Sequence, residues 1–264
     1  MTTNDILHHF YHHCHWVDPA TTVDKVIIGN PKMPIQHALV TWISSRWAIH
    51  EAIKLGADLL VTHEPTFWNH RDHRSDGDDV WSLNKQREIE ESGLIILRLH
   101  DSWDLFPEIG IPFAWAQFLG LDGAPAHIDA KRYQHRYTIP PVTAGEFAHR
   151  VASRTADLGE PTVEFSGSSS QFIHSVGIGT GCECDPRVFQ KMGCDLAVVC
   201  DDGIYYWAHV QRCLDFGMPV ICVNHGTSEE PGMATLAHYL RETFWGLHVE
   251  HLPHPCCFTH IAAK

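Results

Sequence analysis

Short apolar segments and amphipathic helical segments alternate along most of the chain, and this alternation constrains the fold more than any other feature. Residues 58–62, for example, read DLLVT, an apolar run of strand length that suits a parallel sheet buried on both faces. A helix capped by Ser44 or Ser45 precedes this run and stops at Gly56. Strands joined by single helices pair in parallel through right-handed crossovers. The sequence therefore predicts an α/β protein with mostly parallel sheets.

The same rhythm occurs in two series, which predict two lobes. The expected strands are residues 37–43, 58–62, 94–99, 136–139, 162–165, 175–178, 195–200, 219–223 and 247–251. The expected helices are residues 45–55, 82–92, 112–119, 143–155, 185–193, 205–216 and 231–244. The turn-rich stretch 120–131 best separates the two series. We expect a first lobe of residues 1–127 plus 223–264, which carries the metal ligands named below, and a second lobe of residues 128–222.

The charge balance excludes several classes of protein. The chain has 32 acidic and 19 basic residues, a formal net charge of −13. Because such a surface repels phosphate backbones, we expect no nucleic-acid partner. No stretch approaches the roughly 20 apolar residues that cross a bilayer, and the first residues do not form a signal peptide. These features predict a cytoplasmic protein with no membrane association.

Histidine is unusually abundant, with 22 copies, and three histidines follow predicted strands directly. They are His63, His100 and His225, and each is followed closely by carboxylates: Glu64, Asp101 and Asp104, and Glu229. Ligands of parallel sheets collect beyond the carboxyl ends of the strands. Histidine with carboxylate is the ligand mixture that Zn, Mn and Fe accept. The sequence therefore predicts that divalent metal ions bind at these strand ends.

Other histidines and the nine cysteines are less informative. The N-terminal histidines share an amphipathic helical stretch with Ile6 and Phe10, which favours a solvated or interface helix face, with adventitious metal binding as the alternative. These histidines are His8, His9, His12, His13 and His15. Most cysteines lie in apolar runs, as expected of buried reduced thiols, and Cys182-Glu183-Cys184 lacks zinc-ribbon spacing.

Several segments resemble the Nif-three-like family, also called YbgI-like and often labelled GTP cyclohydrolase I type 2 homologues. VTHEP (61–65), HDSWD (100–104) and NHGTSE (224–229) resemble the family's ITHHP, HTNLD and GHxxTE motifs in the same order. VGIGTGC (176–182) resembles its glycine-rich turn, and MGCDLAVVCDD (192–202) resembles its next strand. The resemblance covers roughly residues 26–240.

The resemblance implies a Nif-three-like fold with two α/β lobes and a dinuclear metal centre in the cleft between the lobes. The family's ligands carry over to His63, Asp104, His225 and Glu229. It also implies a toroidal homohexamer whose metal sites face its interior.

One departure concerns Glu64, which stands where the family has the second histidine of its HH pair. Glu64 either ligates as a charged oxygen or points away and leaves a single tight site. Ligation would bring three carboxylates to two ions, which shifts the expected metal toward Mn or Fe with Zn still open. His100 serves as a ligand or supports one. The predicted metal residues are therefore His63, Glu64, His100, Asp104, His225 and Glu229.

Two functions remain open at this stage. Two divalent ions activate water and polarise a carbonyl or phosphoryl oxygen, which favours a hydrolase of a small cyclic amide, nucleotide or phosphoester. The alternative is a non-catalytic metal carrier or regulatory adaptor, which the histidine count and the acidic charge favour. Arg98, Arg71 and Arg74 and the loop 69–79 are candidates to close over the site, but a plain surface loop is the favoured alternative. The glycine turn either packs tightly or offers amides to a phosphate.

Overall fold

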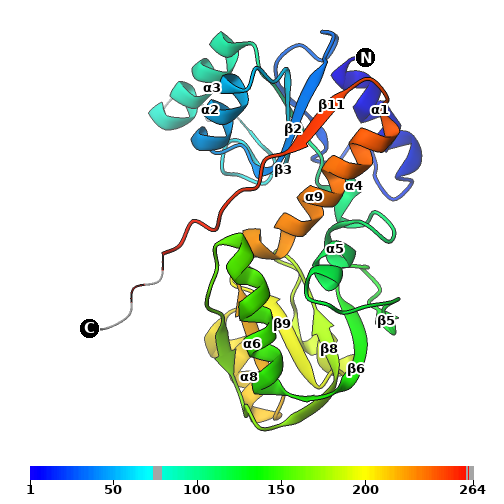
Figure 1. Cartoon of the computed structure of the whole chain (residues 1–264), viewed down its shortest axis with the longest axis vertical. Coiled ribbons are helices and arrows are strands. Elements are labelled where there is room, and N and C mark those ends of the chain that lie inside the picture. Colours follow the sequence, from blue (N-terminus) through cyan, green and yellow to red (C-terminus); the bar gives the residue numbers. More distant parts are fainter. Residues whose placement is uncertain (74–78, 260, 262–264) are drawn as a thin grey trace. The chain divides into compact units, whose positions relative to one another are not determined.

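The two β/α series form two separate sheets in a computed structural model of the chain, which describes residues 1–73, 79–259 and 261. The chain divides into two compact units, shown by sequence colour in Figure 1. The first comprises Met1–Phe106 and Met233–His254, and the second comprises Pro107–Gly232 and Pro255–Lys264. Helix α9 (His225–Thr243) begins in the second unit and ends in the first.

The first unit contains a five-stranded sheet in the order β1-β4-β3-β2-β11. Strands β4, β3, β2 and β11 pair in parallel, and β1 pairs antiparallel with β4 at one edge. The strand bounds are β1 Lys25–Ile28, β2 His37–Ile43, β3 Leu59–Glu64, β4 Ile95–Arg98 and β11 His248–His251. This sheet confirms the prediction of mostly parallel strands for the first series.

Helices α2 (Arg46–Lys54) and α3 (Val80–Ser92) lie on one side of this sheet, and α1 (Thr3–His13) lies on the other (Figure 1). Ile49 of α2 and Ile89 of α3 form one buried cluster with Leu39, Leu60 and Ile96 of the strands. A short helix, α4 (Asp101–Asp104), follows β4. Local signals set these helices, as expected: the Ser45 hydroxyl caps α2, and Gly93 in the left-handed region ends α3.

The second unit contains a six-stranded sheet in the order β5-β6-β8-β9-β10-β7. Only β8-β9 and β9-β10 are parallel pairs, and the outer pairs are antiparallel. The bounds are β5 His127–Ile128, β6 His135–Thr143, β7 Glu164–Ser166, β8 Phe172–Ile178, β9 Leu196–Cys200 and β10 Val220–Val223. The prediction of mostly parallel pairing therefore holds for the central strands β8, β9 and β10. It is wrong for the outer strands β5, β6 and β7, which pair antiparallel with their neighbours.

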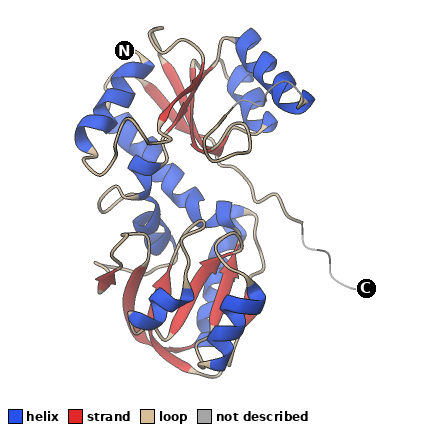
Figure 2. Cartoon of the chain, turned by 180° about the vertical axis from the view of Figure 1, so that it is seen from behind, coloured by secondary structure: helices blue, strands red, loops and turns tan. Residues whose placement is uncertain are grey.

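Helices of the second unit are α5 (Ile111–Phe118), α6 (Ala144–Thr155), α7 (Pro186–Lys191) and α8 (Gln211–Asp215), drawn in blue in Figure 2. A 3-10 turn, Ala156–Leu158, follows α6, and a π-helical turn, Tyr206–Val210, precedes α8. The predicted capping box is present, since the Thr143 hydroxyl accepts from the Glu146 amide and the Glu146 carboxylate accepts from Thr143. Throughout the part of the chain that the structure describes, no helix is long and apolar enough to cross a membrane.

The boundaries of the units differ from the expected lobes, 1–127 plus 223–264 and 128–222. Trp115 and Ala116 of α5 and the following Leu119 and Leu121 belong to the core of the second unit, which moves the first boundary back to residue 107. Helix α9 also begins at His225, six residues before the expected start at Pro231. The Asp201 carboxylate accepts the His225 amide at 2.8 Å and so supports the earlier helix start.

Candidate metal centre

The first unit brings His63, His100 and Asp104 together. His63 lies near the end of β3, and His100 precedes α4, whose last residue is Asp104. One ligand atom of each side chain lies within 4.8 Å of the others. His63 Nε2 is 3.4 Å from Asp104 Oδ1, and His100 Nδ1 is 3.2 Å from Asp104 Oδ2. Ligands about 2.1 Å from an octahedral or tetrahedral ion are about 3.0–3.4 Å apart, so these residues fit a metal ion.

The orientation of His63 also suits a metal ligand. Its Nδ1 lies 3.3 Å from the Leu99 carbonyl oxygen, which can only accept a hydrogen bond. Nδ1 therefore donates to this carbonyl, and Nε2 faces Asp104. The His63 side chain is fully buried. Fixing one imidazole nitrogen on an acceptor is the usual way in which proteins orient a ligating histidine.

The His100 ring stacks on the His63 ring with centroids 4.4 Å apart and 12° between the planes. Its Nδ1 is also 3.0 Å from Asp101 Oδ1, and its Nε2 is 4.0 Å from Glu64 Oε1. Burial by itself lowers the pKa of His100, but the carboxylates of Asp104, Asp101 and Glu64 outweigh burial and raise this pKa to about 9. The carboxylates thus make this cluster favourable for positive charge, which a divalent ion supplies.

Asp104 shows the same balance from the carboxylate side. Burial opposes its charge, yet His100 and His63 hold the pKa of Asp104 below its ordinary value. Asp101 contacts His100 through Oδ1, whereas its Oδ2 accepts the Thr22 hydroxyl at 2.7 Å and the Val23 amide at 3.2 Å. Asp104 contacts both His63 and His100, which favours it over Asp101 as the candidate ligand.

Glu64 lies beside Arg98, with Oε2 3.7 Å from the Arg98 guanidinium. The Arg98 side chain is fully buried, and it donates to the His63 carbonyl at 2.8 Å and to the His70 carbonyl at 2.6 Å. Arg98 is therefore part of the floor of the site and not of a closing loop, which corrects that expectation. Arg71 donates to the Thr21 carbonyl at 3.0 Å, and Arg74 lies outside the described residues.

Sequence reasoning missed Asp24, which positions α4. Its Oδ1 accepts the backbone amides of His100 at 2.6 Å and Asp101 at 2.8 Å, and its Oδ2 accepts that of Ser102 at 2.9 Å. A buried carboxylate at a helix start satisfies amides that have no partner within the helix. Asp24 lies 76 residues before His100, so no local pattern connects the two.

The second unit places His225 and Glu229 on the first turn of α9. His225 Nε2 is 3.1 Å from Glu229 Oε1, and His225 Nδ1 is 3.1 Å from Asp202 Oδ2. The Asp202 carboxylate thus holds the Nδ1 proton, and Nε2 faces Glu229 in the manner of a ligating histidine. Asp202 was not among the predicted site residues, although the quoted CDD segment contains it.

The glycine turn lies directly against this second pair. A Cβ added at Gly181 would lie 2.6 Å from Glu229 Oε1 and 2.9 Å from His225 Nε2, and Gly181 has φ +53°. Cβ atoms at Gly177 and Gly179 would also lie within 2.5 Å of neighbouring atoms. These contacts favour tight packing as the reason for the glycines.

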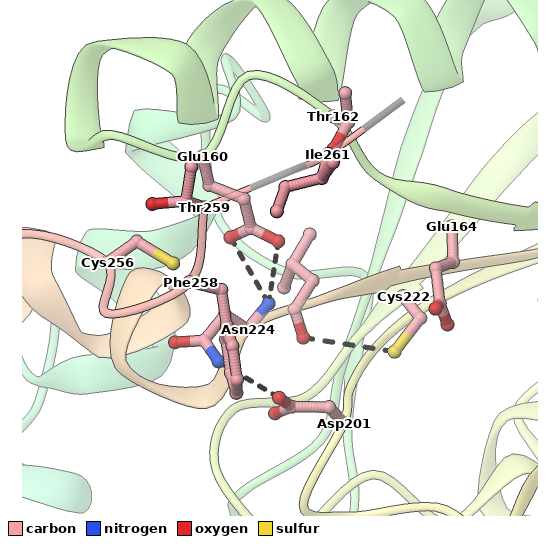
Figure 3. A pocket seen from close by; sticks show the side chains of 11 residues that line it. Glu160, Thr162, Glu164, Asp201, Cys222, Asn224, Cys256, Phe258, Thr259 and Ile261 are labelled. Atoms are coloured by element: carbon pink, nitrogen blue, oxygen red, sulfur yellow. Dashed lines mark hydrogen bonds between the residues drawn. The ribbon is translucent and has the colours of Figure 1, made fainter. Parts of the chain in front are cut away.

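A pocket of about 470 Å³ lies in the second unit beside the start of α9 (Figure 3). The Glu160 carboxylate accepts the Asn224 amide at 2.9 and 3.2 Å, and the Asp201 carboxylate accepts the Asn224 side-chain amide at 2.9 Å (Figure 3). Both carboxylates therefore hold Asn224, the residue directly before His225, in place. None of the predicted metal residues lines this pocket.

The N-terminal histidines are not part of a comparable cluster. Ile6 and Phe10 of α1 are buried, whereas His12 and His13 are exposed, as expected for an amphipathic helix. Within residues 1–73, 79–259 and 261, no group of three close metal-binding side chains includes these histidines.

The family model described as Duf34/NIF3 (NGG1p interacting factor 3) matches residues 1–255. The chain belongs to the DUF34/NIF3 family. This match confirms the family resemblance seen in the motifs. A search of curated proteins finds no match to this DUF34/NIF3 chain.

Solved structures share the DUF34/NIF3 fold. The Staphylococcus aureus hypothetical protein SA1388 is 18% identical, with 99% of each chain covered and a TM-score of 0.81. A Bacillus cereus protein related to NIF3 is 14% identical, with 99% of each chain covered and a TM-score of 0.80. Protein ybgI, whose function is given as unknown, is 17% identical over 97% of this chain and 100% of that chain, with a TM-score of 0.79. The family and the His/carboxylate groups together support metal binding.

Proposed function

We propose that this DUF34/NIF3 protein binds two divalent metal ions and hydrolyses a small cyclic amide, nucleotide or phosphoester. In this proposal the first unit supplies His63, Glu64, His100 and Asp104, and the second unit supplies His225 and Glu229. The observation that carries the proposal is the pairing of His63 Nε2 with Asp104 and of His225 Nε2 with Glu229, while each Nδ1 is held by an acceptor.

The donor set suits Mn, Fe or Zn, because it mixes imidazole nitrogens with carboxylate oxygens. Bound ions would supply Lewis-acid activation of water and polarisation of a substrate carbonyl or phosphoryl oxygen. The chain itself orients the ligands: the Leu99 carbonyl sets the His63 tautomer, and the Asp202 carboxylate sets that of His225. Arg98 holds the backbone of His63 and lies beside the Glu64 carboxylate.

Metal stoichiometry of tag-free protein, measured by elemental mass spectrometry, tests the binding proposal. We expect about two ions per chain after reconstitution with Mn, Fe or Zn. Protein that never holds more than trace metal would contradict the proposal. Electron paramagnetic resonance of the Mn(II)-loaded protein tests the dinuclear form, since only neighbouring ions give a spin-coupled spectrum.

A screen of nucleotides, phosphoesters and cyclic amides with metal-loaded protein tests hydrolysis. We expect turnover that disappears after chelation and in the double variant His225→Ala/Glu229→Ala. Retained metal without turnover of any of these classes would remove the hydrolase proposal and leave metal binding intact.

A metal carrier or regulatory adaptor is the second candidate, and the net charge of −13 with 22 histidines favours it. The rate of metal exchange distinguishes the two, because a carrier releases ions readily and an enzyme retains them. The homohexamer and the cytoplasmic location remain predictions. Light scattering during size-exclusion chromatography tests the first, and fractionation of cells tests the second.

A further inference from the structure

A second group of metal-binding side chains lies on strands β2 and β11 of the first unit, outside the site described above. It consists of His37, His248 and Glu250, whose nearest ligand atoms all lie within 4.8 Å of one another. We infer that these three residues bind a divalent transition-metal ion of the Zn²⁺ or Ni²⁺ type at the edge of the sheet.

Parallel pairing places the three side chains together. His37 and His248 are direct partners across β2 and β11, and Glu250 lies two residues beyond His248. Residues i and i+2 of a strand share one face of the sheet, so all three side chains leave from the same face. The group therefore follows from the register of the two strands and not from flexible loops.

Three ligand atoms converge on a small volume. His37 Nε2 is 3.0 Å and His248 Nε2 is 3.8 Å from the same oxygen, Glu250 Oε1. The two imidazole rings are stacked, with centroids 4.6 Å apart and 23° between the planes. Ligands around an ion about 2.1 Å away are about 3.0–3.4 Å apart, so the 3.0 Å contact has this spacing and the exposed His248 side chain must move closer by about 0.4 Å.

The chemistry of the three ligands selects the ion. Two imidazoles and one carboxylate are the protein ligands of many zinc sites that keep an open coordination position. Imidazole suits Zn, Ni and Cu, whereas Mg and Ca prefer oxygen ligands alone. The side chains are 17% (His37), 66% (His248) and 49% (Glu250) exposed, so an ion can enter from solvent and retain water ligands.

This group is separate from the candidate metal centre of the same unit. His37 begins β2, whereas His63 lies near the end of β3, and β2 pairs in parallel with β3 from Ala38↔Leu59 to Ile43↔Glu64. Along these paired strands the position of His63 lies five residues beyond that of His37, a distance of roughly 17 Å at about 3.3 Å per residue. One ion cannot bind both groups.

A bound ion would connect β2 to β11, whose residues His37 and Glu250 are 213 positions apart in the chain. β11 is the last strand in the sheet order and has β2 as its only neighbour among the described strands. An ion that binds only the folded arrangement stabilises it by RT ln(1 + [L]/Kd), so the melting temperature rises with the concentration of the ion. Metal binding here would therefore stabilise the attachment of the edge strand.

The test compares tag-free wild-type protein with His248→Gln, and uses His238→Gln as the matched control. His238 is an exposed histidine of α9 outside the group, so the control makes the same chemical change. We expect wild type and His238→Gln to bind one Zn²⁺ or Ni²⁺ ion per chain more than His248→Gln, by elemental mass spectrometry and isothermal titration. We also expect the Ni²⁺-dependent rise in melting temperature to shrink in His248→Gln.

Glu250→Gln provides a second variant that keeps both imidazoles, and its affinity for the extra ion should fall about tenfold or more. Equal ion counts and equal melting shifts in wild type, His248→Gln and Glu250→Gln would overturn the inference and leave a hydrogen-bonded pair on the sheet edge. The result is independent of the main centre, because His63→Ala should leave this ion in place.

Discussion

The candidate ligand set of the first unit and the candidate ligand set of the second unit orient a histidine by different means. In the first, His63 is fully buried and its Nδ1 donates to a backbone carbonyl, that of Leu99. In the second, His225 is held by Asp202, a side chain that is 64% exposed. The backbone carbonyl cannot move away without distorting the sheet, whereas the Asp202 carboxylate can rotate into solvent.

The two sets also differ in how many segments build them. His63 comes from β3, His100 directly precedes α4, and Asp104 ends α4; Asp24 and Arg98 hold these segments. His225 and Glu229 lie one helical turn apart on α9. The first set therefore depends on the complete sheet of its unit, and the second set depends on one helix turn and the glycine turn beside it. Changes to the two sets should have separable effects on metal binding.

The largest expected effect is that of His63→Ala. It removes a buried ligand, so we expect the affinity of the first set to fall by at least about a hundredfold, while the second set keeps its ion. Isothermal titration and elemental analysis measure both. His127→Ala, at an exposed histidine of the second unit, is the control. Unchanged metal content in His63→Ala would contradict the ligand assignment.

Gly181→Ala should weaken binding at the second set, by less than His63→Ala weakens binding at the first, and should spare the first set. The new Cβ would occupy space within 3 Å of both Glu229 and His225, which must separate. Gly123→Ala is a matched control, because Gly123 has φ +85° with no atom within 4 Å of its Cβ position. Both variants carry backbone strain of order 1–3 kcal/mol, so only a difference in metal content between them tests the contact. Equal metal content in the two variants would show that the ligands tolerate the displacement.

Asp202→Asn should weaken the second set more modestly, by about 10- to 100-fold. The amide can still contact His225 Nδ1 but carries no charge, so it no longer raises the basicity of the imidazole. Asp157→Asn, at an exposed aspartate, is the control. Asp195→Asn would not serve, because the Asp195 carboxylate accepts two backbone amides. Titration of Zn²⁺ or Mn²⁺ checks the difference, and an affinity equal to that of wild type would remove Asp202 from the site.

The smallest expected effect is a change of metal preference in Glu64→His, which restores the residue of the family motif. If Glu64 ligates, replacing its oxygen by a nitrogen should shift competition between Zn²⁺ and Mn²⁺ severalfold toward Zn²⁺. Glu64→Gln removes the charge without adding a nitrogen and separates the two causes. An unchanged preference in both variants would mean that Glu64 pairs with Arg98 and binds no ion.

Most secondary structure was predictable because its signals are local. The expected strand at residues 37–43 coincides with β2, and Ser45, Thr143 and Asp185 cap helices as predicted. The short edge strand β1 was missed, because four residues are too few to show a helical or an alternating pattern of apolar residues. The start of α9 was also missed, because Pro231 resembles a helix start and the capping by Asp201 comes from another strand end.

The sequence by itself determined the α/β class, the family and the three strand-end histidines with their carboxylates. These follow from periodicity and from residues adjacent in the chain, where the backbone geometry of a strand or a helix turn dictates the spacing. Only the tertiary structure decided the roles of Asp24, Arg98 and Asp202 and the grouping of His37, His248 and Glu250. Each of these contacts joins residues that lie far apart in the chain, and their distances depend on how the sheets pair and how the core packs.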